Sequence, residues 1–158
     1  MTLGTPHLHL RAIGSTSDRA RELAAAGAPH GTLVTTDHQV AGRGRQGRTW
    51  TTPPRLALTM SLVLREVTPL LPMAAGVAVA DAVGAAAAIK WPNDILIDGR
   101  KVAGILAEAR PREGWAILGI GINVALRPDD FPPELRVRLT GGGTTALDAG
   151  EVHLGVPL

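Results

Sequence analysis

The sequence predicts an α+β domain in which helices pack against a mixed, largely antiparallel sheet. Runs that alternate between apolar and polar residues, as strands do, recur between residues 7 and 124. Two segments with the composition and end signals of helices come before residue 90. After residue 94 the strands follow one another with only short turns between them, so neighbouring strands there are expected to be antiparallel.

The chain opens with a strand and a helix. Residues 7–13 alternate polar and apolar side chains and predict a short strand. Ser15 or Thr16 is expected to cap a helix that runs to about Ala26 and stops at Gly27.

Two strands and a second helix come next. Residues 31–37 are β-rich in composition. Residues 56–64 predict a strand with one strongly buried face, formed by Leu56, Leu58, Met60, Leu62 and Leu64. Thr68-Pro69 is expected to open an Ala-rich helix within residues 70–88. This segment is nearly long enough to span a bilayer, but its Ala content and central Asp81 favour a buried helix, and no membrane association is expected.

The second half predicts an antiparallel meander. Residues 95–97 lead into Asp98-Gly99, a dipeptide typical of two-residue hairpin turns. Residues 102–109 and 115–124 are expected to form the next two strands, with a turn at residues 111–114 between them.

Composition narrows the range of functions. A chain that is 45% hydrophobic and 19% charged is expected to fold, and the lack of cysteine excludes disulfides and cysteine-ligated metal sites. No basic stretch followed by an apolar run opens the chain, so a cytoplasmic location is expected. The net charge is only +2, yet Arg43, Arg45 and Arg48 fall within six residues. This clustering favours a local anion site over a nucleic-acid-binding surface.

The segment QVAGRGRQGRTW, from Gln39 to Trp50, combines glycines with arginines. Glycines let backbone N–H groups approach a ligand closely, and guanidinium groups bind phosphate or carboxylate through two parallel hydrogen bonds. The segment lacks the Gly-Lys-Ser/Thr of a Walker loop. Taken alone, it leaves a flexible basic loop or an RNA contact open as alternatives.

The segment KWPNDILIDGRKVAGIL, residues 90–106, places polar residues between apolar runs. A proline pushes the residue before it toward extended geometry, so Asn93 and Asp94 are expected at an irregular corner beside strands. These two residues would also suit a simple turn, but a turn requires neither the Lys nor the Trp before them. Lys101 and Gly104 lie just past the hairpin, where a lysine is more often an exposed edge residue.

The segment GIGINV, residues 119–124, carries two glycines in an apolar strand. Glycines there suggest close approach of another backbone or of a ligand. Asn123 must find hydrogen-bond partners in this apolar setting, and a structural bond to neighbouring backbone is the alternative to a ligand. His7 and His9 share a strand face and could bind a metal ion, but an ordinary pair on an edge strand is the favoured interpretation. No metal ligand is therefore assigned.

Together these segments resemble the biotin–protein ligase family, also called biotin–[acetyl-CoA carboxylase] ligases. The resemblance covers about residues 10–124 and rests on Ser15-Thr16-Ser17, GRGRQGRTW, KWPND with KVAGIL, and GIGINV, in the family's order. It implies the biotin/lipoate ligase-like fold, which is related to class II synthetases.

The resemblance implies a reaction in two steps. The carboxylate of biotin attacks the α-phosphate of MgATP and gives biotinyl-5′-AMP and pyrophosphate. A lysine of a biotin carboxyl carrier domain then attacks the mixed anhydride and releases AMP. Both reactants of the first step are anions, so cationic groups are needed to offset their repulsion and to stabilise the charge that builds at phosphorus.

The resemblance also implies roles for individual residues. The expected catalytic residues are Arg43, Arg45, Lys101 and Asp94. The residues expected to bind biotin are Ser15, Thr16, Gln39, Gly42, Arg43, Lys101 and Gly104. The residues expected to bind the nucleotide are Arg45, Arg48, Trp50, Asn93 and Asn123. Within these sets, Trp50 is expected beside the adenine and Asp94 is expected to orient or deprotonate the incoming lysine, while Lys90 supports the corner that holds Asp94.

Three departures from the family pattern accompany this assignment. Ser17 stands where many relatives carry Asn. No helix-turn-helix is recognised ahead of the core, assigned to residues 1–140, so a repressor role is not expected. Residues 141–158 are assigned as a tail of uncertain structure that does not resemble the family's continuation into a small SH3-like domain.

Other functions stay open from the sequence. A truncated or degenerate relative would hold biotin or its adenylate with little transfer activity. Lipoate–protein ligases and octanoyl transferases share the fold, although the GRGRQGR loop favours biotin. A nucleic-acid binder is disfavoured because the basic residues form one cluster. A sheet edge would also support a homodimer, which the sequence does not specify.

Overall fold

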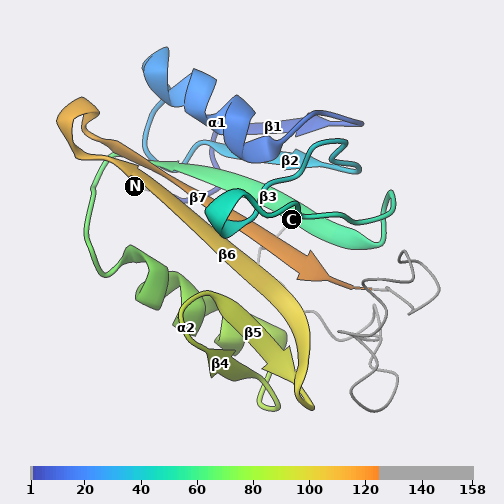
Figure 1. Ribbon diagram of the computed structural model, residues 1–158. Coiled ribbons are helices and arrows are strands. Elements are labelled where there is room, and N and C mark those ends of the chain that lie inside the picture. The colour runs from blue at the N-terminus through green and yellow to red at the C-terminus, as the bar shows by residue number, and fades with distance from the viewer. Residues whose placement is uncertain (1, 125–158) are drawn as a thin grey trace.

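Seven strands form one mixed sheet in the computed structural model of the chain, which describes residues 2–124 (Figure 1). The strands are β1 (His7–Leu10), β2 (Leu33–Thr36), β3 (Ala57–Leu64), β4 (Ala88–Lys90), β5 (Asp94–Ile97), β6 (Arg100–Arg110) and β7 (Trp115–Asn123). Their order in the sheet is β1-β2-β3-β7-β6-β5-β4. Only the β1–β2 pair is parallel among these described strands. The predicted fold class is therefore confirmed, including the antiparallel meander of β5, β6 and β7.

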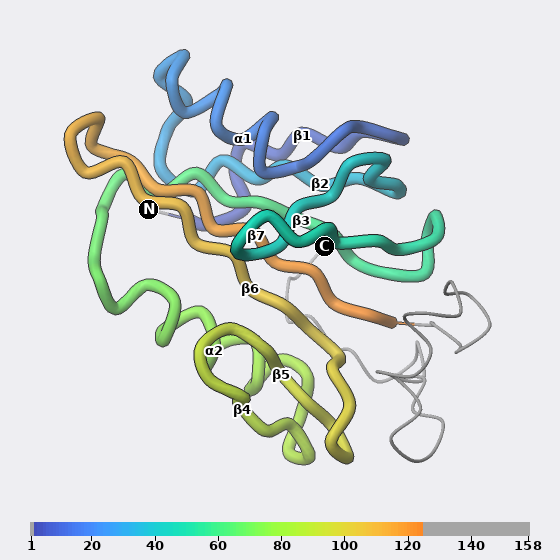
Figure 2. Tube along the Cα trace, viewed as in Figure 1, coloured from blue at the N-terminus to red at the C-terminus, as the bar shows by residue number. Residues whose placement is uncertain are grey.

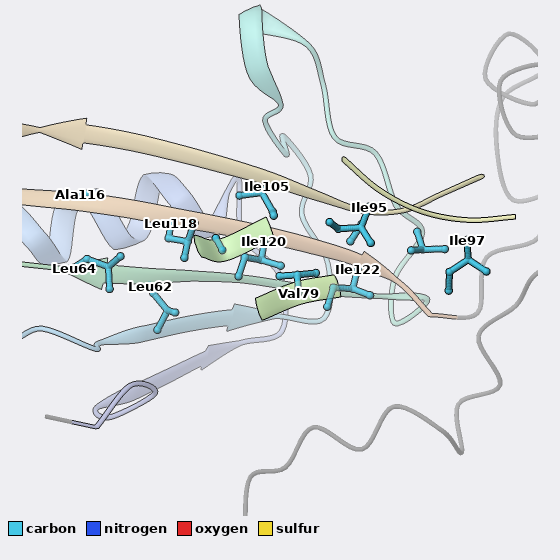
Figure 3. Packing of buried hydrophobic residues seen from close by; sticks show 13 residues of the cluster. Leu62, Leu64, Val79, Ile95, Ile97, Ile105, Ala116, Leu118, Ile120 and Ile122 are labelled. Carbon is cyan, nitrogen blue, oxygen red and sulfur yellow. The ribbon is translucent and has the colours of Figure 1, made fainter. Parts of the chain in front are cut away.

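Two helices, α1 (Thr16–Ala25) and α2 (Leu71–Val83), cover opposite faces of the sheet. Alternate residues of β7 belong to two separate apolar clusters, because successive side chains of a strand point to opposite faces. Ile117 packs with Ala20 and Ala24 of α1, whereas Ile120 packs with Val79 of α2 (Figure 3). The sheet is thus the middle layer, with α1 packed on β2, β3 and β7 and α2 packed on β4–β6 (Figure 1).

Strand β3 is buried on both faces, which corrects the prediction of one strongly buried face. Leu62 and Leu64 pack on the α2 side. On the other side Thr59, Ser61 and Val63 are at most 3% exposed. The reason is the central position of β3, which lies between β2 and β7 with α1 over its more polar face. Polar residues at alternate positions of a strand predict an exposed face, but in β3 this face is buried against α1.

The end of β1, the start of α2 and the presence of β4 differ from the prediction. β1 ends at Leu10 rather than at Ile13, which instead forms an isolated bridge to Gln39. α2 begins at Leu71, because Thr68 bonds the backbone N–H groups of Leu70 and Leu71 in a turn before the helix. The edge strand β4 was not predicted, since three exposed residues are too short a run to show a period.

The predicted glycine positions at the end of α1 and in the β5–β6 hairpin are confirmed. Gly27 ends α1 with a φ of +89°. Asp98 and Gly99 have φ values of +49° and +75°, as the hairpin turn between β5 and β6 requires. Ser15 occupies the N-cap position of α1 but makes no side-chain cap bond. Within residues 2–124, no helix is long and apolar enough to cross a membrane. The predicted tail at residues 141–158 lies outside the described residues.

The core on the α1 side gives a direct stability test. Ile117 is fully buried, so Ile117→Ala should lower the free energy of unfolding by about 2 to 5 kcal/mol through lost burial and the cavity left behind. Val77→Ala is the matched control, because Val77 is 52% exposed on α2 and its truncation should change stability by less than about 1 kcal/mol. Urea unfolding of both variants measures the difference; equal losses would contradict the core assignment.

Candidate active site

A cavity of about 800 Å³ opens on the α1 face of the sheet. It lies between the start of α1, the loop that joins β2 to β3, the β4–β5 turn, and strands β6 and β7. In Figure 2 that loop runs in front of β6 and β7. The cavity therefore brings together the three segments that the sequence singled out.

The floor of the cavity is a pair of glycines on neighbouring strands. Gly104 of β6 and Gly121 of β7 lie opposite each other in register. A Cβ at Gly121 would lie 2.6 Å from the indole ring of Trp50, and a Cβ at Gly104 would lie 3.0 Å from the same ring. The glycines of β7 were predicted to allow close approach of another backbone or of a ligand; the group that packs on Gly121, and on Gly104 beside it, is instead the side chain of Trp50.

A third glycine of this face makes room for a hydroxyl. A Cβ at Gly119 would lie 2.7 Å from Oγ of Ser17, which is on the first turn of α1. Ser17 lines the cavity and is 5% exposed. Any larger residue at position 119 would therefore displace the Ser17 hydroxyl.

Thr16 and Gln39 form a fixed polar pair at the same end of the cavity. The backbone N–H and the hydroxyl of Thr16 both donate to Oε1 of Gln39, at 2.8 and 3.0 Å. An N–H can only donate, so Oε1 faces Thr16 and the amide Nε2 of Gln39 is left for other partners. Gly42 is packed against this amide and the Trp50 carbonyl, which leaves no space for a Cβ. Ser15, which lines the cavity beside them, is 2% exposed.

Lys101 and Asp94 form an ion pair at the other end. Nζ of Lys101 lies 2.6 Å from Oδ1 of Asp94, although the two groups are not aligned as a hydrogen bond. The same Nζ lies 5.4 Å from the centre of the Trp50 ring, a distance at which the ring face attracts a cation. Lys101 thus lies beside both Asp94, which was predicted to be catalytic, and Trp50, which was predicted to bind the nucleotide.

Arg45 connects the glycine-arginine loop to the β4–β5 turn. Its Nη1 donates to Oδ1 of Asn93 at 3.2 Å. Arg48 and Lys90 also line the cavity. An anion bound at this point would contact side chains of the glycine-arginine loop and of the β4–β5 turn at the same time.

Arg43 lines the cavity but its guanidinium group is held in an ion cluster. Nη2 lies 2.6 Å from Glu108 on β6, and Nε lies 3.3 Å from Asp18 on α1. Arg21 contacts the same two acids, at 3.1 Å from Asp18 and 3.2 Å from Glu108. Sequence reasoning missed this cluster, because its members are far apart along the chain and resemble ordinary exposed charges.

Asn123 lies at the end of β7, outside the residues that line the cavity. Its Nδ2 donates to the backbone carbonyl of Lys101 at 3.2 Å, while its Oδ1 is buried with no hydrogen-bond partner among residues 2–124. Nε1 of Trp50 is likewise buried with no partner in this described part of the chain. Buried polar atoms usually have a partner, so these two need one.

The charge that lines the cavity is predominantly positive. Its cationic residues are Arg43, Arg45, Arg48, Lys90 and Lys101, and Asp94 is the one acidic residue among the described lining residues. The opposite end, around Thr16, Ser17 and Gln39, is polar and uncharged. In residues 2–124 no group of three or more His, Asp or Glu side chains is arranged to hold a metal ion.

Comparison with known proteins gives matches over most of the chain. Residues 10–124 match the biotin/lipoate A/B protein ligase family. The bifunctional ligase/repressor BirA of Bacillus spizizenii is 46% identical over 146 residues, which cover 85% of this chain and 45% of that protein. The biotin–[acetyl-CoA-carboxylase] ligase of Mycobacterium tuberculosis is 39% identical over 152 residues, covering 87% of this chain and 53% of that protein.

A solved structure shares the arrangement. The biotin protein ligase of Aquifex aeolicus in complex with biotin and ATP has a TM-score of 0.72 and 33% identity, and the match covers 86% of this chain and 59% of that one. The chain spans about half the length of the curated relatives it matches.

The glycine floor can be tested by filling it. Gly121→Ala should push the Trp50 ring off the sheet, because the new Cβ would lie within 2.6 Å of it. Acrylamide quenching of tryptophan fluorescence should then increase in a Trp91→Phe background, which removes the exposed tryptophan and leaves Trp115, only 3% exposed, as a weakly quenched partner. Gly76→Ala, where nothing lies closer than 3.9 Å, should leave quenching unchanged. Equal quenching in all three proteins would count against this packing.

Proposed function

The chain belongs to the biotin/lipoate A/B protein ligase family, and from this premise we propose that it activates biotin as biotinyl-5′-AMP and transfers the biotinyl group to a lysine of a biotin carboxyl carrier domain. One observation carries the proposal. A single cavity has an uncharged hydrogen-bonding end at Thr16, Ser17 and Gln39, and a cationic end at Lys101 and Arg45. This arrangement suits a ligand with a neutral urea ring at one end and a carboxylate at the other, which must meet a phosphate.

In the first step, a carboxylate oxygen of biotin attacks the α-phosphorus of ATP, and pyrophosphate leaves. Both reactants are anions, so Lys101, Arg45 and Arg43 are assigned to offset their repulsion and to stabilise the charge on the phosphoryl oxygens. The ion pair with Asp94 holds Lys101 at the cationic end of the cavity. Mg²⁺ would enter as part of the MgATP substrate, because Mg²⁺ commonly binds through substrate phosphates and keeps several waters.

In the second step, the uncharged amine of the carrier lysine attacks the acyl carbon of biotinyl-AMP, an amide forms, and AMP leaves. The attacking nitrogen loses a proton, and Asp94 is assigned to orient the amine or accept that proton. Asp94 lines the cavity beside Lys101, which supports this role.

Ligand-binding roles follow the two ends of the cavity. Ser15, Thr16 and Gln39 are assigned to the urea ring, with the backbone of Gly42 and Gly104 close to it. Trp50 is assigned to the adenine; the unpartnered Oδ1 of Asn123 suits an exocyclic amino group. Arg48 and Asn93 are assigned to the phosphates and ribose. We expect the protein to act in the cytoplasm, where ATP and newly made carrier domains are available, and a homodimer remains a hypothesis from the sequence.

The decisive experiment mixes the full chain with biotin and MgATP and then adds a biotin carboxyl carrier domain. Biotin-dependent exchange between pyrophosphate and ATP reports the first step, and mass spectrometry of the carrier reports a biotinylated lysine. Exchange without transfer would support an adenylate-forming module; calorimetric biotin binding without exchange would support a binding module. Replacing biotin by lipoate tests the related ligases. Absence of biotin binding, exchange and transfer would refute the proposal.

Lys101 is expected to act on the first step. Lys101→Ala should slow biotin-dependent exchange by about 10²- to 10³-fold, the usual effect of removing one group that stabilises a transition state. Its thermal stability should hardly change, since the ammonium group is partly exposed. Arg112→Ala, an exposed cation in the turn before β7, is the control that should keep full activity. An unchanged exchange rate in Lys101→Ala would remove Lys101 from catalysis.

Arg43 and Arg21 form a matched pair, because both contact Asp18 and Glu108 but only Arg43 lines the cavity. Arg43→Ala should reduce exchange by about 10²-fold or more. Arg21→Ala removes the same charge from the same cluster and should leave exchange within about three-fold of the unmodified protein. Equal losses in the two variants would show that the cluster acts only on structure.

A further inference from the structure

Four buried side chains form a continuous hydrogen-bonded chain behind the uncharged end of the cavity. Oγ of Ser17 lies 3.0 Å from Oγ of Ser61, and Ser61 donates to Oγ1 of Thr16 at 2.9 Å. Thr16 in turn donates to Oε1 of Gln39 at 3.0 Å. Ser61 is 0% exposed on β3 and is not among the residues that line the cavity. It therefore links two cavity-lining hydroxyls from behind.

Gln39, the last residue of this hydrogen-bonded series, determines which hydroxyl donates to which. Oε1 of Gln39 can only accept, so the Thr16 hydroxyl must give its proton to Gln39. The proton of Ser61 then goes to Thr16, because Thr16 has none left to give. Ser61 is left able only to accept from Ser17, so the proton between these two hydroxyls comes from Ser17.

This fixed order of donors determines which hydrogen-bonding groups the cavity presents to a ligand. Ser17 and Thr16 present only lone pairs, because their single protons are used inside the chain. Gln39 presents the N–H groups of its amide, because its oxygen is held by Thr16. Acceptors beside a donor complement a ring with N–H groups next to a carbonyl, which is the pattern of a cyclic urea. A dithiolane ring or a plain acyl chain has neither group.

We propose that Ser61 is a positioning residue for substrate choice, which orients the hydroxyls of Thr16 and Ser17 so that the cavity selects a cyclic urea by its N–H groups. The inference rests on the proposed function, since it concerns the biotin end of the same cavity. Ser61 acts through its neighbours and does not touch the ligand. Gly119 belongs to this arrangement, because a Cβ there would lie 2.7 Å from the Ser17 hydroxyl.

Calorimetry on the full chain tests this with Ser61→Ala, which removes the hydroxyl and leaves the rest of the residue. The Ser17 proton then loses its acceptor and becomes free to point at the ligand. Biotin affinity should fall by about three- to ten-fold, the range for one hydrogen bond. The rate of pyrophosphate exchange at saturating biotin should stay within about two-fold, because the cationic end is unchanged.

Two cyclic carbamate analogues of biotin complete the experiment, each with oxygen in place of one ureido N–H. The analogue that lacks the N–H facing Ser17 places a ring oxygen there, so it should bind Ser61→Ala at least as tightly as the unmodified protein, because the freed Ser17 proton can donate to that oxygen. Equal weakening of biotin and both carbamates would show a packing defect and overturn the proposal. Unchanged biotin affinity in Ser61→Ala would also overturn it. If the unmodified protein binds no biotin, the proposed function itself fails.

Two further variants separate stability from selection. Thr32→Val removes another buried hydroxyl, whose bond to the Pro29 carbonyl lies outside the cavity. It should lower stability without changing any ligand affinity. Ser61→Cys keeps a weak S–H donor and should give a biotin affinity between those of the unmodified protein and the Ser61→Ala variant. It also provides the same comparison if Ser61→Ala does not fold.

Discussion

The register between β6 and β7 is the constraint on which the site depends. It sets Gly104 opposite Gly121, and these two residues without side chains leave a flat area of sheet on which the Trp50 ring lies. Trp50 ends the glycine-arginine loop, so its packing fixes one end of that loop against the sheet. A slip of one residue in either strand would place an isoleucine or an alanine under the ring and turn the glycines to the α2 face.

One cluster of opposite charges joins α1, the glycine-arginine loop and β6. Asp18 and Glu108 neutralise Arg43 and Arg21 at the junction of α1, the loop and β6. Arg48 and Lys90 keep their charge toward the cavity. These pairs are partly exposed, so each contributes little to stability. Their effect is instead to restrict where flexible arginine side chains can go.

Much of the architecture was predictable because it depends on local patterns. Gly27 and the Asp98-Gly99 turn follow from backbone freedom, and the strand glycines indicated a close approach, although side chains rather than another backbone pack against them. The β4 strand was missed because it is short and exposed, and the burial of Thr59 and Ser61 was missed because it depends on a helix distant in sequence. Glu108 and Ser61 could not be assigned for the same reason: each acquires its role from contacts with α1 or the glycine-arginine loop, which are distant in sequence.

The separation of the two faces of the sheet has a consequence for how such a protein changes over time. The α1 face holds the cavity and its polar contacts, whereas the α2 face holds an apolar cluster that includes Val79, Ile97 and Ile120. Substitutions that improve packing on the α2 face alter no residue of the hydroxyl chain or the ion cluster. That face is therefore where mutation or engineering can add stability with least conflict with the chemistry.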